Sequence, residues 1–292
     1  MDINELFGYK GKNVLVTGAF SGMGKSAARL LTQLGANVYA VCRRNGRHSQ
    51  LDFEVTKIIY ADLGVKEDLD HLVSELPDDL FAIFFCHGIA LNNQGTSYTD
   101  DSNAEEVMKV NLLSTKYLIP QIIDKIEKAG SITIIASSGG FNWRDNRDNC
   151  LELLDVESWE DGVKWCQQHH DIIASAYVFS KECLNCYVVA NTFNPMFIDR
   201  QIRINCINPG NTNTGLKSDF GRYTSSVGDE AVGIDMIEEI FLRPWNGYWA
   251  SPEQMGYPLV CIGSKIFSYM SGQTIFIDYG ISNTWLYNPY WY

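Results

Sequence analysis

The chain has 292 residues, 46% of them hydrophobic, which is enough for one large α/β domain with a full core or for two small domains. Its net charge of −12 at pH 7 repels phosphate backbones and so argues against a nucleic-acid partner. No apolar run reaches 18 residues, and residues 1–8 carry Asp2 and Glu5 without a basic cluster before an apolar stretch. We therefore expect no membrane span, no secretory signal and a cytoplasmic location.

The eight cysteines contain a single CxxC pair, Cys183 and Cys186, and no second pair at the spacing of a zinc site. Several of them, such as Cys86 and Cys206, lie in apolar runs. Reduced, partly buried thiols and no metal site are therefore expected.

Short β-branched runs alternate with helical patterns along the chain, which predicts successive βα units and a parallel sheet. Seven strands are expected, at Asn13–Thr17, Asn37–Cys42, Lys57–Ala61, Phe81–Cys86, Ile132–Ala136, Arg203–Ile207 and Thr274–Asp278. Helices are expected at Lys25–Leu34, Lys66–Glu75, Ala104–Ile126, Ala174–Asn191 and Pro252–Ile262. No linker divides this pattern, so residues 1–292 are predicted to form a single α/β domain with a doubly wound parallel sheet of Rossmann type.

Two long segments interrupt the alternation, at residues 139–170 and 215–248. The first is polar and rich in Asp, Asn and Trp, and the second mixes Gly, Tyr and Trp with charge. Long excursions from a compact domain are usually functional loops or lids. We predict an insertion after the fifth strand at 139–170 and a substrate lid at 215–248, with a surface elaboration or a subunit contact as the alternative.

The first strand runs directly into a glycine-rich segment that precedes a helix. Glycines there allow a sharp turn and a close approach to a pyrophosphate, and the helix N-terminus supplies free N–H groups. A tight ligand-free βα turn is the alternative. The predicted cofactor contacts in this segment are Thr17, Gly18, Ser21, Gly22, Met23 and Gly24. The spacing TGxxxGxG resembles that of the short-chain dehydrogenase/reductase family.

The end of the second strand bears on which nicotinamide dinucleotide is bound. An acidic residue there would bind the adenosine ribose and repel a 2′-phosphate, but Cys42 stands at this position and Arg43 and Arg44 follow it. Guanidinium groups suit a phosphate, so NADP(H) is favoured over NAD(H). Against this, Ser21 stands where many NADP-preferring relatives carry a basic residue, and the two arginines could lie in a solvated loop.

The resemblance extends to two further turns after predicted strands. Asp62-Leu63 follows the third strand and resembles the family's contact with the edge of the adenine. Cys86-His87-Gly88 stands where the family usually has Asn-Ala-Gly, a departure that should keep the turn but change its side-chain bonds. Cys86 and Gly88 are therefore also expected to contact the cofactor.

Tyr177 and Lys181 form a YxxxK pattern, whose two side chains share one face of a helix. A free tyrosine has a pKa of about 10, and a nearby ammonium lowers it toward the working pH of a proton donor. Because YxxxK is common by chance, the pattern alone is weak. The family resemblance makes Ser137, with Ser138 as the alternative, the serine that hydrogen-bonds the substrate oxygen, and Asn111 the asparagine that orders water behind the lysine.

The segment from Asn205 onward resembles the family's N-x-x-x-P-G-x-x-x-T, which would hold the carboxamide of the nicotinamide. Its expected contacts are Pro209, Gly210, Thr212 and Thr214. Taken together, the resemblance implies an oxidoreductase that moves a hydride between a nicotinamide and a secondary alcohol or ketone.

The gap from Ser137 to Tyr177 is 40 positions, longer than in most of the family. It resembles the insertion of bacterial 3α-hydroxysteroid dehydrogenase/carbonyl reductase, which implies a steroid or bile acid as substrate, with the 3-position favoured. A steroid needs a broad apolar slot. The candidate slot residues are Phe141, Trp143, Trp245, Tyr248 and Trp249, together with the aromatic tail Trp285, Tyr287, Tyr290, Trp291 and Tyr292, which could equally dock on its own surface or on a second subunit.

Two other functions stay open. One is a carbonyl reductase for 3-oxoacyl thioesters, sugars or small xenobiotic ketones. The other is a non-catalytic NAD(P) sensor, although a sensor has no need of the serine, tyrosine, lysine and asparagine together. A homodimer or homotetramer is expected from the family, with Cys183, Cys186 and Val189 on a helix of the kind that packs between subunits.

Overall fold

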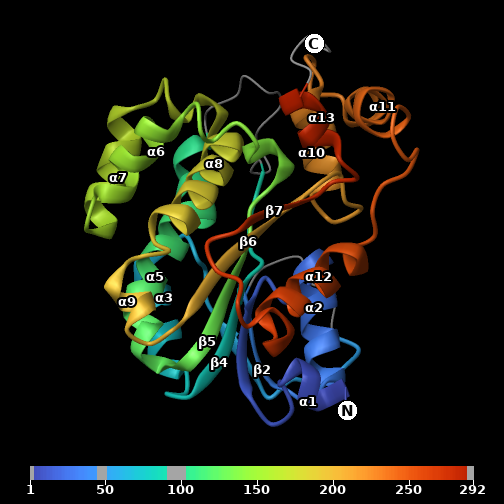
Figure 1. Cartoon of the computed structure of the whole chain (residues 1–292). Helices are drawn as coiled ribbons and strands as arrows, with labels where there is room; N and C mark the ends of the chain where they lie inside the picture. The colour runs from blue at the N-terminus through green and yellow to red at the C-terminus, as the bar shows by residue number, and fades with distance from the viewer. Residues whose placement is uncertain (1–2, 45–50, 91–102, 288–292) are drawn as a thin grey trace.

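The computed structural model describes residues 3–44, 51–90 and 103–287, whose centre is a sheet of seven parallel strands with helices on both faces (Figure 1). The strands lie in the order β3-β2-β1-β4-β5-β6-β7. Their bounds are β1 (Asn13–Thr17), β2 (Asn37–Cys42), β3 (Lys57–Tyr60), β4 (Leu80–Phe85), β5 (Ile126–Ile135), β6 (Arg203–Pro209) and β7 (Thr274–Ile277). The expected Rossmann-type doubly wound sheet of seven strands is confirmed.

Consecutive residues of the central strands face opposite sides of the sheet, and each side has its own core. Leu15 and Ile83 pack in one cluster with α3, α5 and α8, whereas Val14 and Phe84 pack in the other with α2 and α12. Because both faces are covered, these strands are apolar throughout instead of alternating with polar residues. Figure 1 shows the two helical layers on either side of the sheet.

The helices are α1 (Ile3–Phe7), α2 (Gly22–Gln33), α3 (Lys66–Glu75), α4 (Ala104–Met108), α5 (Ser114–Ile122), α6 (Arg147–Asp155), α7 (Trp159–Gln168), α8 (Ala176–Ala190), α9 (Pro195–Ile198), α10 (Lys217–Thr224), α11 (Glu230–Ile237), α12 (Pro252–Gly263) and α13 (Ile281–Tyr287). The helix expected at Ala104–Ile126 is instead α4 and α5 joined by a π-helical turn at Lys109–Leu113. A 3-10 turn closes it, and Ile126 already belongs to β5.

The strand order reverses between β1 and β4, because the chain winds outward from this pair in both directions. The carboxyl ends of two such strands diverge into crossovers on opposite faces of the sheet, which opens a crevice where doubly wound folds bind ligands. The glycine-rich segment follows β1, and the Cys86–Gly88 turn follows β4. Both predicted cofactor segments therefore meet at this crevice.

The predicted insertion, residues 139–170, contains helices α6 and α7, which lie beside α8 (Figure 1). Cys150 of α6 is hydrogen-bonded to Cys183 and Cys186 of α8, and all three thiols are buried. Cys183 and Cys186 were expected on a helix face that packs against a second subunit. That expectation is wrong for these two residues, because the chain's own insertion covers them. Val189, 40% exposed, remains open to such a contact.

Among the described residues, one helical stretch, Ile172–Ala190, is by length and composition apolar enough to cross a membrane. Lys181 and Glu182 interrupt its apolar residues, so the sequence contains no continuous apolar run of 18 residues here. In the fold 67% of the stretch is buried, and it packs against the sheet and α6 as a core helix.

Candidate active site

The glycine-rich segment has the geometry of a phosphate cradle. Gly18 and Gly22 have φ angles of +63° and +50°, which glycine adopts without strain. A Cβ at Gly24 would lie 2.3 Å from the carbonyl oxygen of Gly18, so α2 can begin this close to β1 only with glycine there. Ser21 is the extended N-cap residue of α2 and makes no side-chain capping bond. The first amides of α2 therefore face the crevice without a capping side chain, which suits an anionic pyrophosphate.

The ends of β2 and β3 place the predicted adenosine contacts at the same edge of the sheet. Cys42 is buried, while Arg43 and Arg44 are exposed, and the Arg44 guanidinium lies 5.2 Å above the ring centroid of Tyr60. Asp62 accepts a hydrogen bond from the Gly64 N–H, and Leu63 is buried. Arg43 is thus the one of the two arginines without a described stacking partner.

The turn after β4 is held by His87, a residue the sequence analysis did not select. Its Nδ1 lies 2.7 Å from Thr17 Oγ1, and its Nε2 lies 2.9 Å from Ser114 Oγ. Ser114 donates its own proton to the Val110 carbonyl, so Nε2–H is the donor to Ser114, and the low pKa of the ring leaves Nδ1 to accept from Thr17. A neutral His87 therefore connects the start of the glycine-rich segment to the helix that follows the π-helical turn.

Burial, with a further contribution from the charge of Lys181, lowers the pKa of His87 to about 3. An unfolded histidine has a pKa of about 6.5, so below that pH the unfolded chain binds a proton that the native chain does not. We expect His87 to decrease the free energy of unfolding by about 2 kcal/mol at pH 5 relative to pH 7. The variant H87Q, which stays neutral, should lose less stability than the unchanged chain over this range in urea titrations at both pH values. Parallel losses in the two proteins would contradict a buried neutral histidine.

Ser137 and Tyr177 meet at the carboxyl end of β5. Ser137 follows the strand in an extended conformation, and its Oγ accepts a hydrogen bond of 3.0 Å from the Gly139 N–H. Burial raises the pKa of Tyr177 to about 12, and a hydrogen bond with Ser137 lowers it. Of the two candidate serines, Ser137 is the one whose side chain contributes to the pKa of Tyr177.

Lys181 lies one helical turn after Tyr177 and is 3% exposed. Its Nζ donates a hydrogen bond of 3.0 Å to the Ile135 carbonyl and lies 5.7 Å from the Tyr177 ring centroid. Burial lowers the pKa of Lys181 to about 8. In this structure burial raises the pKa of Tyr177 and Ser137 lowers it, so the expected lowering by Lys181 and the nicotinamide charge together stays a prediction for the cofactor-bound site.

Asn111 sits in the π-helical turn and is buried. Its amide makes a reciprocal pair with the Ile89 backbone, with distances of 2.8 and 2.9 Å, and also donates to Ser180 Oγ. A Cβ on Gly88 would lie 3.4 Å from Asn111 Oδ1 and 3.5 Å from Lys181 Nζ. The absence of a side chain at Gly88 thus leaves Asn111 and Lys181 facing one another.

The segment after β6 returns to the glycine-rich segment. Pro209 ends the strand, and Gly210 packs against Asp278, where a Cβ would lie 2.9 Å from the Asp278 Cα. Thr212 donates a hydrogen bond to the Gly210 carbonyl. A Cβ on Gly22 would lie 3.1 Å from the Thr214 methyl, so the start of the predicted lid contacts the phosphate cradle.

Aromatic rings from the serine turn, the predicted lid and α13 form two groups of contacts, one of which includes Tyr177. Phe220 of α10 meets the Tyr177 ring edge-on at 5.1 Å between centroids. Trp285 of α13 lies 5.6 Å from Phe141, four residues after Ser137, and 5.1 Å from Phe241. Phe141 and Trp285 were predicted from the sequence, whereas Phe220 and Phe241 were not. Phe220 contacts Tyr177, and Phe241 contacts Trp285, only because of the way the predicted lid folds.

The other proposed slot residues lie elsewhere. Trp143 is 5% exposed and belongs to the core beneath the insertion, so it is not a wall of the slot. Trp249 donates a hydrogen bond to Glu238 and stacks with Lys217, and it therefore joins the two ends of the predicted lid. Tyr290, Trp291 and Tyr292 lie outside the described residues, and nothing described places Trp245 against the rings.

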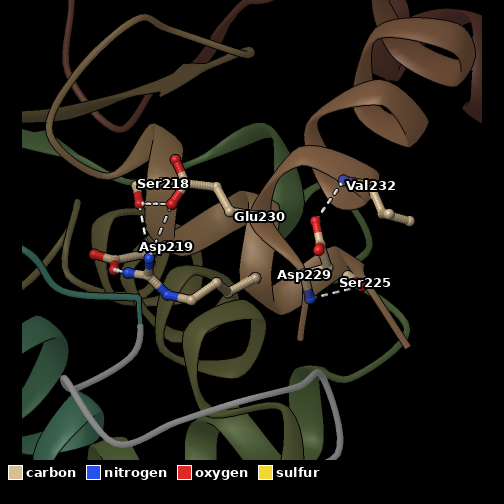
Figure 2. A network of polar contacts seen from close by, with 7 residues as sticks. Ser218, Asp219, Ser225, Asp229, Glu230 and Val232 are labelled. Carbon is tan, nitrogen blue, oxygen red and sulfur yellow. Dashed lines mark hydrogen bonds and ion pairs between the residues drawn. The ribbon is translucent and has the colours of Figure 1, made fainter. Parts of the chain in front are cut away.

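A polar network ties α10 to α11 within the predicted lid (Figure 2). Arg222 pairs with Asp219 at 2.5 Å and Glu230 at 3.1 Å, and Ser218 donates to the same Glu230 carboxylate. The two helices cross at glycines, where a Cβ on Gly233 would lie 1.7 Å from the Gly221 carbonyl oxygen. The segment predicted as a lid is thus a close-packed helical hairpin.

A cavity of about 470 Å³ opens beside Gly210 and Asn211, between α12, the end of β7 and Leu242 and Tyr248 of the lid. None of Ser137, Tyr177, Lys181 or Asn111 lines it. The reacting centre is better identified by the groups that would take part in the reaction than by the cavity. These groups are the Tyr177 hydroxyl, Ser137 beside it and the buried ammonium of Lys181.

Known proteins resemble this chain in sequence and in fold. Residues 12–147 match the family model of short chain dehydrogenases. A coniferyl-alcohol dehydrogenase from a Pseudomonas species is 26% identical over 94% of this chain and 98% of its own length. A 3-oxoacyl-[acyl-carrier-protein] reductase from Rickettsia typhi is 24% identical over the same two shares.

Among solved structures, a 3-alpha-hydroxysteroid dehydrogenase from Pseudomonas sp. B-0831, complexed with NADH, superposes with a TM-score of 0.71. It is 18% identical and covers 96% of this chain and 100% of its own, a likeness that speaks for the fold. The matched N-terminal segment, the relatives that span nearly the whole chain and the seven-stranded sheet agree with one another. In sequence and in fold, the chain is therefore similar to the short-chain dehydrogenases/reductases, a family of NAD(P)-dependent oxidoreductases.

Proposed function

We propose that the chain interconverts a secondary alcohol and a ketone on a flat apolar substrate, namely a hydroxysteroid or bile acid reacting at the 3-position. The observations that carry the proposal are the contact of Phe220 with Tyr177 and the cluster that Trp285 makes with Phe141, in the serine turn, and with Phe241. Rings from the serine turn, the lid and α13 offer a broad apolar surface with few polar anchors, which fits a fused-ring skeleton. The long insertion between Ser137 and Tyr177 supports the same substrate class.

The roles of the site residues follow from their placement. In alcohol oxidation Ser137 and Tyr177 bind the substrate hydroxyl, and ionised Tyr177 takes its proton as the carbonyl forms. A bound nicotinamide supplies the acceptor or donor of the hydride. Lys181, held at the Ile135 carbonyl, supplies positive charge beneath the tyrosine, and Asn111 fixes the neighbouring turn at Ile89. In ketone reduction Tyr177 returns the proton to the oxygen.

The residues that would hold the cofactor fit a dinucleotide, because Gly18, Gly22 and Gly24 leave a cradle that a Cβ at Gly24 would fill. We propose NADP(H) as the preferred form. Arg43 is exposed beyond the end of β2, where a 2′-phosphate on the adenosine ribose would meet it, while Arg44 stacks on Tyr60.

A second candidate is the oxidation of an aromatic alcohol. The relative that is 26% identical over 94% of the chain bears the name coniferyl-alcohol dehydrogenase, and a phenyl ring would stack on Phe220 as readily as a steroid would. The acidic net charge of −12 argues against a 3-oxoacyl group on an acidic carrier, because such a carrier favours a basic entrance.

Turnover of a 3-hydroxysteroid, coniferyl alcohol and a 3-oxoacyl thioester, each with NAD(H) and NADP(H), tests the proposal by absorbance of the reduced nicotinamide. We expect the highest kcat/KM for the steroid with NADP⁺. F220A should lower it about 10- to 100-fold by removing an apolar wall. F193A removes the same ring from a residue 84% exposed and serves as the matched control.

Each other outcome of this panel has a definite meaning. Preference for coniferyl alcohol would replace the steroid assignment with the second candidate. Tight cofactor binding without turnover of any compound would favour a sensor of the NAD(P) pool.

A further inference from the structure

Two fully buried asparagines form a reciprocal amide pair behind Ser137. Asn208 lies in β6 and Asn185 in α8, and both are 0% exposed. Each side-chain nitrogen donates to the oxygen of the other amide, and both distances are 2.9 Å. Such a pair satisfies the polar groups of both side chains away from water, and it joins the sheet to the helix that carries Tyr177 and Lys181.

The pair is connected directly to the serine turn. The backbone N–H of Ser137 donates to Asn208 Oδ1 at 3.2 Å. The β5–β6 ladder ends one residue earlier, where the Ala136 N–H donates to the Ile207 carbonyl. The Asn208 side chain therefore supplies the next rung, at the residue where β5 leaves the sheet.

The orientation of both amides is fixed by their neighbours. Ser137 N–H can only donate, so the atom of Asn208 facing it must be the oxygen. Asn185 Oδ1 in turn accepts from Asn208 and from the Cys206 thiol at 3.2 Å. A flip of either amide would set donors against donors in a dry site, which costs about 1–3 kcal/mol for each orphaned group.

The same pair holds the other end of the serine turn. The Asn185 amide nitrogen also lies 3.1 Å from the carbonyls of Gly140 and Lys181, so its two protons are shared among these two oxygens and Asn208 Oδ1. A Cβ on Gly140 would lie 2.8 Å from this nitrogen, so the turn packs directly on α8. One amide thus bonds to the end of the serine turn and to the lysine of the site.

We propose that Asn208 and Asn185 are positioning residues, which fix the Ser137 turn against α8 and thereby hold Ser137 Oγ within hydrogen-bonding reach of Tyr177. The proposal rests on the roles given above to Ser137 and Tyr177. Neither asparagine touches the substrate or the cofactor. Their effect passes through the Ser137 backbone on one side and the Gly140 and Lys181 carbonyls on the other.

The consequence is a link between a buried amide and the acidity of Tyr177. The hydrogen bond with Ser137 lowers the pKa of Tyr177, whereas burial raises it. If the serine turn drifts, this lowering is lost, and the ionised tyrosine needed for alcohol oxidation becomes scarcer at a given pH.

The test compares N208A with N205A. Asn205 is a matched control because it lies on the same strand, is equally buried and bonds to Met270 and Gln273 instead of the serine turn. In N208A we expect amide hydrogen exchange in residues 136–141 to accelerate at least about tenfold, as a buried hydrogen bond is lost. The acidic limb of kcat/KM for 3-hydroxysteroid or coniferyl alcohol oxidation should move up by about one pH unit.

N205A should change neither the exchange of residues 136–141 nor the acidic limb, although it destabilises the fold. N185A serves as a second variant should N208A fail to fold, and it should accelerate exchange at Gly140 in particular. Cofactor affinity, read from the fluorescence of the reduced nicotinamide, should stay within threefold in all variants.

The outcomes separate this proposal from the proposed function. An acidic limb in N208A that coincides with that of N205A would overturn the positioning role while leaving the oxidoreductase intact. If the unchanged chain oxidises neither alcohol, the proposed function fails. Exchange at residues 136–141 then decides the proposal alone, and an unchanged rate in N208A and N185A would refute it.

Discussion

Y177F is expected to lower kcat about 10³-fold, because it removes the hydroxyl that carries the proton and leaves the rest of the site in place. The lost group is the one that Ser137 hydrogen-bonds, while Lys181 keeps its bond to the Ile135 carbonyl. Cofactor affinity should change less than threefold. Steady-state turnover and fluorescence of the bound reduced nicotinamide measure the two quantities.

Y187F is the matched control for this variant. Tyr187 lies on the same helix, is 5% exposed, and loses the same hydroxyl without touching the site.

In the unchanged chain, alcohol oxidation should rise about tenfold per pH unit below the pKa of Tyr177, since the ionised fraction rises by that factor. Near-normal turnover by Y177F, or a rate of oxidation independent of pH, would exclude Tyr177 as the base.

R203M is expected to lower the free energy of unfolding by about 3 kcal/mol or more, the largest stability effect we foresee for one side chain. Arg203 is 7% exposed, and its guanidinium donates to four carbonyls at and after the end of α12. The acceptors are the carbonyls of Ile262, Gly263, Ser264 and Phe267, at 3.0 to 3.1 Å. Methionine fills the space but leaves all four without this donor, at a helix end that attracts positive charge.

Thermal unfolding should show a fall in Tm of roughly 6–10 °C for R203M. R147M makes the same change at a side chain that is 62% exposed and pairs with the adjacent Asp148, so its cost should stay below about 0.5 kcal/mol. Equal effects of the two substitutions would show that the buried guanidinium contributes no more than a surface one.

The sheet could be predicted closely because its signal is local. β1 and β2 run over the expected Asn13–Thr17 and Asn37–Cys42, since buried parallel strands are short apolar runs bounded by turns. β5 was expected from Ile132 but begins at Ile126. Its first residues include the charged Glu127 and Lys128, which are typical of the end of a helix and not of a buried strand. The π-helical turn around Asn111 leaves no trace in hydrophobic periodicity.

The site could be predicted only where a motif is contiguous in the sequence. Tyr177 and Lys181 are four residues apart, and the turn Gly18–Gly24 spans seven positions, so each motif could be recognised once its place among the predicted strands and helices was considered. Phe220 and Asn208 reach Tyr177 and Ser137 through the folding of the lid and the pairing of β6 with β5. Contacts of this kind depend on tertiary structure, and a buried asparagine in a strand looks in sequence like any polar interruption.

The helices of the insertion, residues 139–170, could not be predicted from local sequence either. Its Asp, Asn and Trp content predicted a loop, yet α6 and α7 form there because Cys150, Leu153 and Trp165 give each helix an apolar stripe. Each row of apolar residues is short and is interrupted by charged residues, so hydrophobic periodicity predicts these helices only weakly. Packing against α8 stabilises the helical conformation of this segment.

The crossing of Gly221 and Gly233 leaves the two helices of the hairpin no room to slide or hinge against each other. The backbone at Phe220, next to one of these glycines, is therefore expected to move with the hairpin as one unit, whose base lies at the bridge between Thr212 and Ala250. The hairpin of α10 and α11 would then turn as one rigid unit about its base and accept substrates according to their thickness. Selectivity among them should respond to substitutions at that base as strongly as to changes in the rings.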